Sequence, residues 1–305
     1  MTKIAVVILN WNGKKDTVAC LKSINIQIGS DYQVLPVVVD NASSDGSSKE
    51  FAHLDIKNLH VIQNKINFGF AKGNNIGIKY AMDKGADYVM VLNNDTVVGD
   101  ETLGKLVRYM EQNPKIAVCS PKIYFAKGYE FHKSRYTSSQ LGKVIWYAGG
   151  VIDWKNVYGK NFGVDEVDEG QFGKNTTTDF ATGACSVFRV KAVKETGLYD
   201  ERYFMYLEDV DLSCRLKEKG WGVNYCGRAH IWHKVAQSSG IGSDLNDYYI
   251  SRNRLLFGFK YAAPRVKVVL FKEAVKFLLV GRKWQKIGVR DYFLGKFGHG
   301  SWKGV

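Results

Sequence analysis

The first third of the chain alternates between continuous apolar runs and segments with helical spacing. The apolar runs, which are rich in β-branched residues, cover residues 4–9, 34–39, 61–62 and 88–92. The segments with helical spacing cover residues 16–24 and 72–84. Strands that are apolar throughout are typical of a parallel sheet covered by helices on both faces. We therefore predict an α/β fold with a mostly parallel central sheet flanked by helices.

Polar side chains follow three of these runs, at the points where the strands are expected to end. These side chains are Asn10, Asp40 and Asn93. In an open α/β sheet, ligands bind at the carboxyl ends of the strands. The sequence therefore predicts a ligand site along this edge of the sheet.

The rest of the chain is less regular. Residues 128–179 are rich in Gly, Lys, Ser, Tyr and Asn, and we interpret them as long loops and short strands that shape a pocket. An ordered block follows at residues 180–232, and helices are predicted at residues 248–259 and 266–280. We accordingly divide the chain into a main domain over residues 1–240, with halves 1–120 and 121–240, and a helical C-terminal extension over residues 241–305.

The basic charge is concentrated in the extension. Residues 251–305 hold 13 of the 43 Lys and Arg residues and two of the 30 acidic ones, and so carry +11 of the net charge of +13. Such a segment attracts a polyanion. Its basic residues are interleaved with apolar ones such as Val268, Phe271 and Leu278, which suits a membrane interface better than a nucleic-acid groove. We expect it to bind a membrane surface, with packing on the main domain or a homodimer contact as the alternatives.

Segment lengths and cysteine usage bear on the location. The apolar run at residues 4–9 is too short for a signal peptide, and no stretch reaches the roughly 18 apolar residues of a spanning helix. The five cysteines have no CxxC or metal-ligand spacing, which favours reduced core residues. We therefore expect a cytoplasmic protein that is peripheral on the cytosolic face of a membrane.

Several short motifs occur in order along residues 3–258. They are VVILNWNG (6–13), VVVDNASSDGS (37–47), NFGFAKGNN (67–75), LNND (92–95), TGAC (182–185), GLYDERYF (197–204) and YLEDVDLSCR (206–215). Together they resemble glycosyltransferase family 2, and within it the rhamnosyltransferase-like branch. The resemblance implies a GT-A fold with a Rossmann-like sheet, in which residues 1–120 bind a nucleotide sugar and residues 121–240 bind the acceptor.

The resemblance also implies a donor site. It implies that the Asp40 carboxylate accepts a hydrogen bond from the N3–H of a uracil or thymine ring. The residues alone fit a helix cap or an Asx turn as well. Lys72 suits the diphosphate, with a solvated lysine at a helix start as the alternative, and the glycines beside it permit a close backbone approach. The residues expected to bind the nucleotide sugar are Asn10, Asn12, Asp40, Asn41, Asn67, Gly69, Lys72, Gly73, Asn74, Asn93 and Asn94.

A metal site is expected where the family has its DxD motif. This chain has Asn93-Asn94-Asp95 there, with one carboxylate in place of two. A hard divalent ion, Mg²⁺ or Mn²⁺, prefers carboxylate oxygen and stabilises the charge of a departing diphosphate. Asp95 is the expected ligand, and His233 is expected to complete the site, with His230 as the alternative.

Glu208 and Asp209 are the expected catalytic pair. They begin a predicted helix that runs to about residue 219, and a carboxylate at a helix N-terminus is held ionised by the helix dipole. Asp211 and Arg215 are four residues apart and are expected to bond to each other. Asp209 faces another direction, so it is our candidate for the base, with Glu208 orienting or binding the acceptor.

These expectations combine into one function. The chain is expected to be an inverting, metal-dependent hexosyltransferase that moves a sugar from a dTDP or UDP donor to a glycan or lipid-linked acceptor in cell-surface polysaccharide synthesis. The branch favours rhamnose from dTDP-rhamnose. The alternatives are a UDP-sugar-dependent enzyme for GlcNAc, glucose, galactose or galactofuranose, and a non-catalytic binder of nucleotide or glycan.

Overall fold

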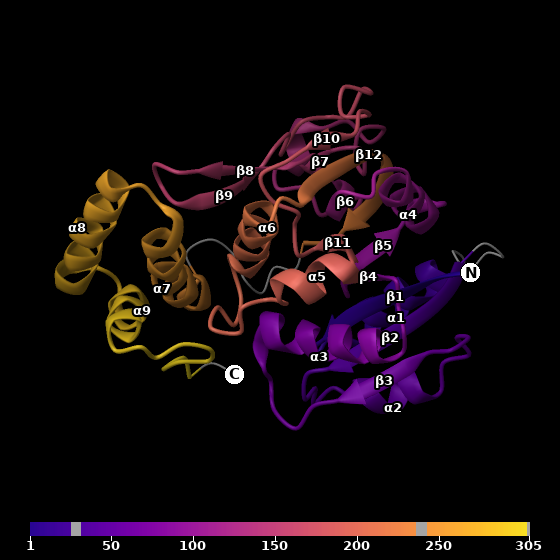
Figure 1. Ribbon diagram of the computed structural model, residues 1–305, viewed down its shortest axis with the longest axis horizontal. Helices are drawn as coiled ribbons and strands as arrows, with labels where there is room; N and C mark the ends of the chain where they lie inside the picture. The colour runs from indigo at the N-terminus through magenta and orange to yellow at the C-terminus, as the bar shows by residue number, and fades with distance from the viewer. Residues whose placement is uncertain (26–31, 236–242, 304–305) are drawn as a thin grey trace.

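The computed structural model describes residues 1–25, 32–235 and 243–303. A twisted sheet runs through the main domain with helices on both sides, and three helices of the extension form a separate layer at one end (Figure 1). The predicted boundary at residue 240 lies outside the described residues. No described helix has the length and apolarity needed to cross a bilayer.

The first half forms the parallel part of the sheet. Its strands lie in the order β4-β1-β2-β3, and all three pairings are parallel. Their bounds are β1 Thr2–Asn10, β2 Tyr32–Asp40, β3 His60–Gln63 and β4 Tyr88–Asn93. The helices of this half are α1 Lys14–Asn25, α2 Ser47–Ala52, α3 Gly69–Asp83 and α4 Thr102–Gln112. The register sets Asn10 beside Asp40 and Leu9 beside Asn93, which confirms that the strand ends form one polar edge.

The second half extends this sheet with a mixture of directions. Strand β11 (Cys185–Arg189) lies antiparallel between β4 and β6 (Ile116–Phe125), and β12 (Gly222–His233) runs parallel to β6. The short strand β5 (Thr96–Val98) pairs with the end of β12, so that His233 lies opposite Thr96. This pairing brings the end of the second half next to the Asn93-Asn94-Asp95 turn.

Short elements fill residues 133–177, as the composition predicted. They are η1 Lys133–Arg135, β7 Ile145–Tyr147, β8 Gly150–Asp153, β9 Tyr158–Asn161 and β10 Thr176–Thr177. Two helices of the second half follow, α5 Val190–Thr196 and α6 Glu208–Glu218. The five cysteines are all unpaired, and all but Cys214 are buried, which confirms their expected place in the core.

The extension consists of α7 Asp244–Tyr261, α8 Pro264–Val280 and α9 Lys283–Phe293. The first two match the predicted helices, whereas α9 was not predicted. Helix α7 is buried along much of its length, and Leu255, Leu256 and Phe257 belong to the main hydrophobic core. The extension is therefore packed on the main domain, and the chain beyond α9 returns toward that domain (Figure 1).

Candidate active site

The edge formed by the strand ends opens into a pocket of about 770 Å³. This volume is in the range of ordinary small-molecule sites. Most of the wall comes from the loops after β1, β2 and β3, as the polar edge predicted. The lining residues are Trp11, Asn12, Ala42, Ser44, Ile66, Asn67, Phe68, Lys72, Glu201, Phe204, Gly298 and His299.

Three of the predicted donor-binding residues line this pocket: Asn12, Asn67 and Lys72. The Asn12 side chain accepts a hydrogen bond from the Ser44 backbone at 2.8 Å, which holds the first two loops together. The Lys72 ammonium lies 4.3 Å from the centre of the Phe68 ring. Lys72 thus combines a positive charge at the pocket wall with a position on the first turn of α3.

Asp40 lies beneath the pocket wall and is fully buried. One carboxylate oxygen accepts hydrogen bonds from the Asn10 amide at 2.9 Å and the Ser43 hydroxyl at 2.5 Å. The other accepts one from the Ser48 hydroxyl. These contacts fix the loop after β2, whose residues Ala42 and Ser44 form part of the wall.

Asn41 joins the loops that follow β2 and β3. It is buried, its amide nitrogen donates to Asn67 Oδ1 at 2.7 Å, and its oxygen accepts from the Asn64 amide and the Phe68 backbone. A single side chain thereby positions Asn67 and Phe68 in the pocket wall.

The glycines of the 67–75 segment serve close packing inside the chain. Gly69 has φ +75°, and a Cβ there would lie 2.5 Å from the Phe204 ring. A Cβ at Gly73 would lie 2.5 Å from Leu9 in β1, so this glycine faces the sheet. Asn74 is also buried and donates to the Phe70 carbonyl at 3.0 Å. Of these three predicted donor-binding residues, Gly69 packs against Phe204, which lines the pocket.

The two asparagines of the Asn93-Asn94-Asp95 turn point to different neighbours. Asn94 donates to the Thr17 hydroxyl at 3.0 Å and lies close to Gly13, where α1 begins. The Asn93 carbonyl accepts from the Thr96 hydroxyl at 2.7 Å. Both asparagines therefore shape the turn that presents Asp95.

Asp95 and His233 come together at the end of β5. His233 Nε2 lies 3.0 Å from Asp95 Oδ1, and both residues are largely buried. His233 Nδ1 is buried with no hydrogen-bond partner among the described residues. His230, the alternative ligand, instead contacts Gly99 and the Trp232 ring. The structure therefore pairs Asp95 with His233.

The residues present fit a divalent ion held jointly with substrate. No cluster of three or more His, Cys, Asp and Glu side chains able to hold a metal occurs within residues 1–25, 32–235 and 243–303. Mg²⁺-type sites commonly use one or two protein carboxylates and complete their shell with water and substrate phosphates. One carboxylate and one imidazole in contact meet that lower requirement.

Helix α6 is preceded by a loop with an unusual backbone. Phe204, Tyr206 and Leu207 all have positive φ, between 65° and 70°, which is costly for residues with a Cβ. The Asn253 amide donates to the carbonyls of Tyr203, Met205 and Tyr206, and so holds the loop from α7. This loop delivers Glu208 and Asp209 at the first turn of α6.

Asp209 is partly buried at this turn. Its carboxylate accepts hydrogen bonds from the Gly183 and Val210 backbones, both at 2.8 Å. Burial raises the pKa of Asp209 above its usual value, and the two backbone donors oppose that rise. A carboxylate with a raised pKa that remains reachable suits a general base.

Glu208 is more deeply buried. Burial, with the neighbouring Asp209 charge as a second cause, raises the pKa of Glu208 well above its usual value. Its Oε2 has no hydrogen-bond partner among the described residues. An unsatisfied buried carboxyl oxygen is costly, and such groups concentrate at functional sites.

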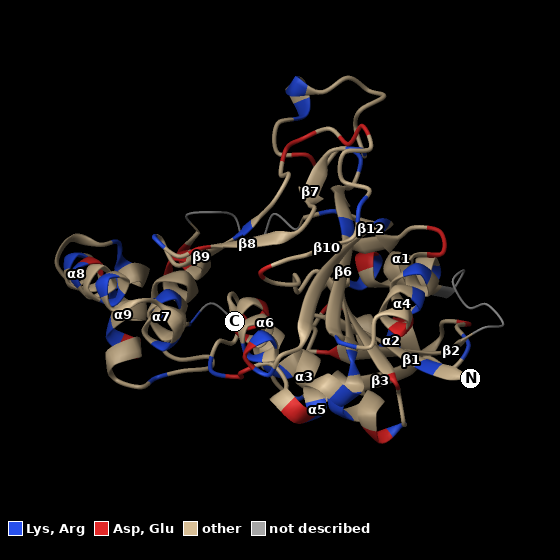
Figure 2. Cartoon of the chain, turned by 45° about the horizontal axis from the view of Figure 1, so that its top comes forward, with Lys and Arg blue, Asp and Glu red and all other residues tan. Residues whose placement is uncertain are grey.

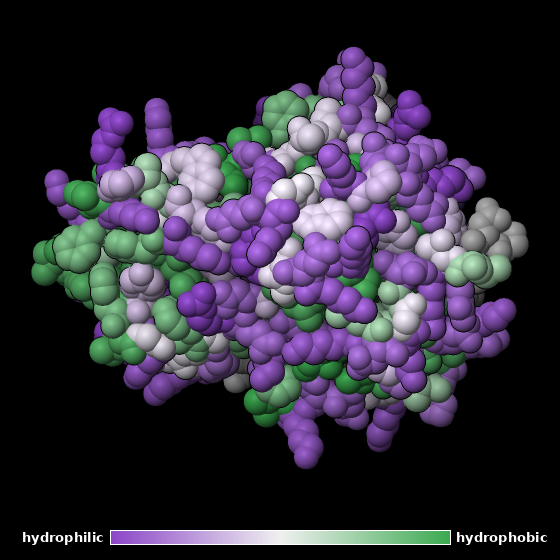
Figure 3. Space-filling model, viewed as in Figure 1, coloured by the Kyte–Doolittle hydropathy of each residue, from purple (hydrophilic) through white to green (hydrophobic). Residues whose placement is uncertain are grey.

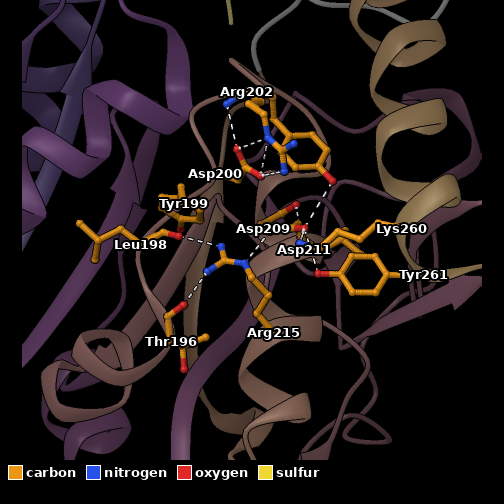
Figure 4. Close-up of polar contacts among 12 residues, drawn as sticks. Thr196, Leu198, Tyr199, Asp200, Arg202, Asp209, Asp211, Arg215, Lys260 and Tyr261 are labelled. Carbon is orange, nitrogen blue, oxygen red and sulfur yellow. Dashed lines mark hydrogen bonds and ion pairs between the residues drawn. The ribbon is translucent and has the colours of Figure 1, made fainter. Parts of the chain in front are cut away.

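Asp211, two residues further along, lies in a different environment. Arg215, Lys260 and Tyr261 converge on its fully buried carboxylate (Figure 4). The Arg215 contact, at 2.7 Å, confirms the predicted pair. Lys260 and Tyr261 come from the end of α7, so Asp211 ties the extension to the main domain.

The segment predicted to bind the donor contacts the segment predicted to carry the catalytic pair. The Ala71 backbone N–H donates to the Phe204 carbonyl at 3.0 Å, which links the start of α3 to the loop before α6. A Cβ at Gly183 would lie 3.0 Å from the Phe70 ring and 3.6 Å from Asp209 Oδ2. Gly183 therefore lies between Asp209 and the first turn of α3, which carries Phe70 and Lys72.

Several lining residues carried no prediction. Trp11 is 44% exposed at the pocket wall, and it lay unassigned within the first motif. Glu201 and Phe204 lay in the GLYDERYF motif without a role. Gly298 and His299 belong to the extension, where the only sequence signal was a Gly-His-Gly triplet.

The model of the family described as glycosyl transferase family 2 matches residues 5–197. The chain belongs to glycosyltransferase family 2. The matched residues include most of the pocket wall and Asp95, whereas Glu208, Asp209 and the extension lie beyond them.

Curated relatives include several family 2 enzymes. The chain is 25% identical over 255 residues to the low-salt glycan biosynthesis hexosyltransferase Agl10 of Haloferax volcanii, covering 83% of this chain and 74% of the relative. It is also 25% identical over 224 residues to the N-acetylglucosaminyl-diphospho-decaprenol L-rhamnosyltransferase of Mycobacterium tuberculosis, covering 71% of each. A shorter match, 34% identical over 119 residues and 38% of each chain, is to the dTDP-rhamnosyl transferase RfbF of Shigella flexneri. The resemblance to rhamnosyltransferases is confirmed.

Solved structures confirm the GT-A fold. GalNAc-T7 with UDP, GalNAc and Mn²⁺ matches with a TM-score of 0.70 and 16% identity, over 95% of this chain and 54% of that longer chain. The mannosyltransferase PcManGT of Pyrobaculum calidifontis with GDP-Man and Mn²⁺ matches with a TM-score of 0.55 and 15% identity, over 96% and 74% of the two chains.

Proposed function

We propose that this family 2 glycosyltransferase transfers a hexose from a pyrimidine nucleoside diphosphate sugar to a hydroxyl of a glycan or lipid-linked acceptor, with inversion. The donor that the rhamnosyltransferase relatives favour is dTDP-rhamnose, and UDP-sugars come second. The observation that carries the proposal is Asp209. It is a partly buried carboxylate without a cationic partner among the described residues, and it lies beside the first turn of α3 at the donor pocket.

Different lining residues of the pocket are proposed to bind different parts of the donor. Trp11 offers an exposed aromatic face on which a pyrimidine ring can stack. The loop fixed by Asp40 and Asn41 contributes Ala42 and Ser44 to the same pocket. Recognition of the N3–H of the pyrimidine by Asp40 remains our prediction. Lys72 supplies positive charge for the diphosphate.

Asp95 and His233 would hold the divalent ion that the two solved structures contain as Mn²⁺. When bound, such an ion stabilises the negative charge of the departing diphosphate. Asn93 and Asn94 contribute by fixing the turn that carries Asp95.

Transfer needs one base. Asp209 takes the proton of the acceptor hydroxyl, whose oxygen forms a bond to the anomeric carbon as the bond from that carbon to the diphosphate breaks on the opposite face. This single displacement inverts the anomeric configuration and releases the nucleoside diphosphate. Glu208, directly before Asp209 in the first turn of α6, orients the acceptor.

The direct test is a panel of dTDP-, UDP- and GDP-sugars, each with and without Mn²⁺. We measure which donor raises the melting temperature, and then follow the anomeric proton of the product by NMR. Stabilisation by a dTDP- or UDP-sugar and an inverted product are expected. Stabilisation by GDP-sugars alone would refute the pyrimidine donor. Binding without transfer to any lipid-linked acceptor would favour a non-catalytic binder.

We also propose that α8 binds the cytosolic face of a membrane. Val268, Phe271, Val275 and Leu278 recur at three- and four-residue steps, and each is at least 40% exposed. Hydrophobic residues gather at the end of the molecule where α8 lies (Figure 3), and Lys and Arg recur along α8 and α9 (Figure 2). An interfacial helix combines such an apolar face with roughly 1 kcal/mol of attraction per basic residue.

Co-sedimentation with anionic and neutral vesicles tests this surface. Replacing Phe271 and Val275 by Ser is expected to abolish binding to anionic vesicles, whereas Val151→Ser, at an exposed apolar residue on β8, is the matched control. If the wild type does not bind at low salt, α8 is not an anchor. A shift from dimer to monomer in the double variant would instead identify a homodimer contact.

A further inference from the structure

The segment after α9 returns to the donor pocket, far from the surface proposed for the membrane. Figure 1 shows this C-terminal stretch, in yellow, running back from α9 toward the main domain. Gly298 and His299 line the same pocket as Asn67 and Lys72. The extension therefore supplies part of the wall of a pocket that is otherwise built from the main domain.

The returning segment is fixed by specific contacts. Arg252 of α7 is fully buried, and its guanidinium donates to the Gly298 carbonyl at 2.7 Å and to the Tyr203 carbonyl at 2.9 Å. The Gly298 N–H donates to the Arg202 carbonyl at 2.9 Å. The buried Arg252 guanidinium therefore joins the returning segment to the loop before α6 through hydrogen bonds to both. Burying a guanidinium is costly unless it is fully hydrogen-bonded, so this arrangement is a specific part of the structure.

The backbone around His299 is shaped to present its side chain. Gly298 and Gly300 have φ values of +63° and +59°, which favour glycine on both sides of the histidine. A Cβ at Gly300 would lie only 2.0 Å from the Tyr248 hydroxyl. That hydroxyl accepts a hydrogen bond from the Ser301 N–H at 2.9 Å, which holds the chain beyond the turn. The sharp turn leaves the imidazole at the pocket.

The His299 imidazole has a packing contact but no polar contact with the described residues. It packs edge-on against the Phe204 ring at 5.5 Å, and it makes no hydrogen bond or ion pair with any residue in the described parts of the chain. His299 is exposed, and its main-chain carbonyl, not its ring, accepts from the Tyr249 hydroxyl at 3.3 Å. Its ring nitrogens are available to a ligand.

We infer that His299 is a donor-binding residue that, together with Lys72, binds the diphosphate of the nucleotide sugar, to which it donates a hydrogen bond. Of the lining side chains, Lys72 and His299 are the two that can carry a positive charge, and a diphosphate is the part of the donor that such groups recognise. The inference rests on the proposed function, because it requires that the pocket bind a nucleoside diphosphate.

The experiment compares affinities for dTDP and UDP with those for thymidine and uridine, by calorimetry on the full-length chain. For the diphosphate that the wild type binds, His299→Ala is expected to weaken affinity about tenfold, the loss of one charge-assisted hydrogen bond, and to leave nucleoside affinity unchanged. His299→Gln, which keeps a donor, is expected to recover part of the loss. Lys296→Ala is the matched control, since it removes an exposed basic residue of the same segment outside the pocket.

The outcomes separate the two proposals. Equal affinity of His299→Ala and wild type for the diphosphate would overturn the role of His299 and leave the proposed function intact. An equal loss of affinity for the nucleoside and for the diphosphate would also overturn the inference, because His299 would then not act on the phosphates. If the wild type binds neither dTDP nor UDP, the proposed function fails and the inference fails with it.

Discussion

The two faces of helix α6 place similar carboxylates in opposite surroundings. On the face toward the Gly183 turn, Asp209 accepts hydrogen bonds only from backbone N–H groups among the described residues. Its neighbour Glu208 has an Oε2 atom without a partner there, and burial raises the pKa of both carboxyls. On the face toward the extension, Asp211 has Arg215, Lys260 and Tyr261 around it. The cationic partners of Asp211 identify it as a carboxylate that stabilises the fold, and their absence around Glu208 and Asp209 in the described part of the chain supports the catalytic role that we propose for this pair.

Asp209→Asn is expected to have the largest effect on activity. Removing a general base lowers the rate by about 10³-fold, whereas the fold and donor affinity should remain because Asn can still accept from the Gly183 backbone. Turnover and donor affinity are measured on the same preparation. Near-normal turnover would remove Asp209 from the role of base and erase the contrast between the two faces.

Asp95→Ala sharpens the comparison by removing a carboxylate that lies outside α6. We expect a loss of at least about 10²-fold in turnover, together with weaker donor binding in the presence of Mn²⁺, because Asp95 would no longer hold the ion that neutralises the diphosphate. Excess EDTA on the wild type should mimic the variant. If Asp95→Ala remained fully active, or EDTA had no effect, the metal proposal would be wrong.

Asp211→Asn is expected to act on stability. Breaking a buried ion pair by neutralising one partner costs about 3 kcal/mol, and here it also loosens α7 from α6. Urea denaturation of this variant and of Asp209→Asn gives the comparison directly. Equal stabilities for the two variants would contradict the division of labour between the faces.

Glu208→Gln is expected to have the smallest effect, and its sign depends on pH. The raised pKa of folded Glu208 means that its ionisation destabilises the fold as pH rises above the usual carboxyl range. A neutral Gln avoids this penalty, so the variant should be more stable than wild type at neutral pH, with the gain lost near pH 4. Thermal melts at both pH values provide the check, and a gain that is independent of pH would point to another cause.

Local pattern was enough to predict much of this molecule. The strands β1, β2 and β4 are continuous apolar runs, and the Asp211–Arg215 pair follows from helical spacing alone. Both are properties of neighbouring residues, so a single sequence contains them.

Contacts between distant segments were beyond the reach of such patterns. The burial of Asp40 beneath three hydrogen-bond donors depends on how the loop after β2 closes, and Gly73 faces Leu9 because α3 lies close on the sheet. His299 reaches the pocket only because α7 and α9 turn the chain back. No local signal encodes these arrangements.

The hydrogen bond from Ala71 to the Phe204 carbonyl has a consequence for motion. It links the start of α3 to the loop before α6, and the Phe204 ring packs against Gly69 at the same place. A movement of α3 relative to the loop before α6 must break this bond, and a movement that keeps the bond must shift both segments together. The Ala71 amide is therefore a natural reporter, and its hydrogen exchange is expected to slow when a nucleotide sugar closes both segments together.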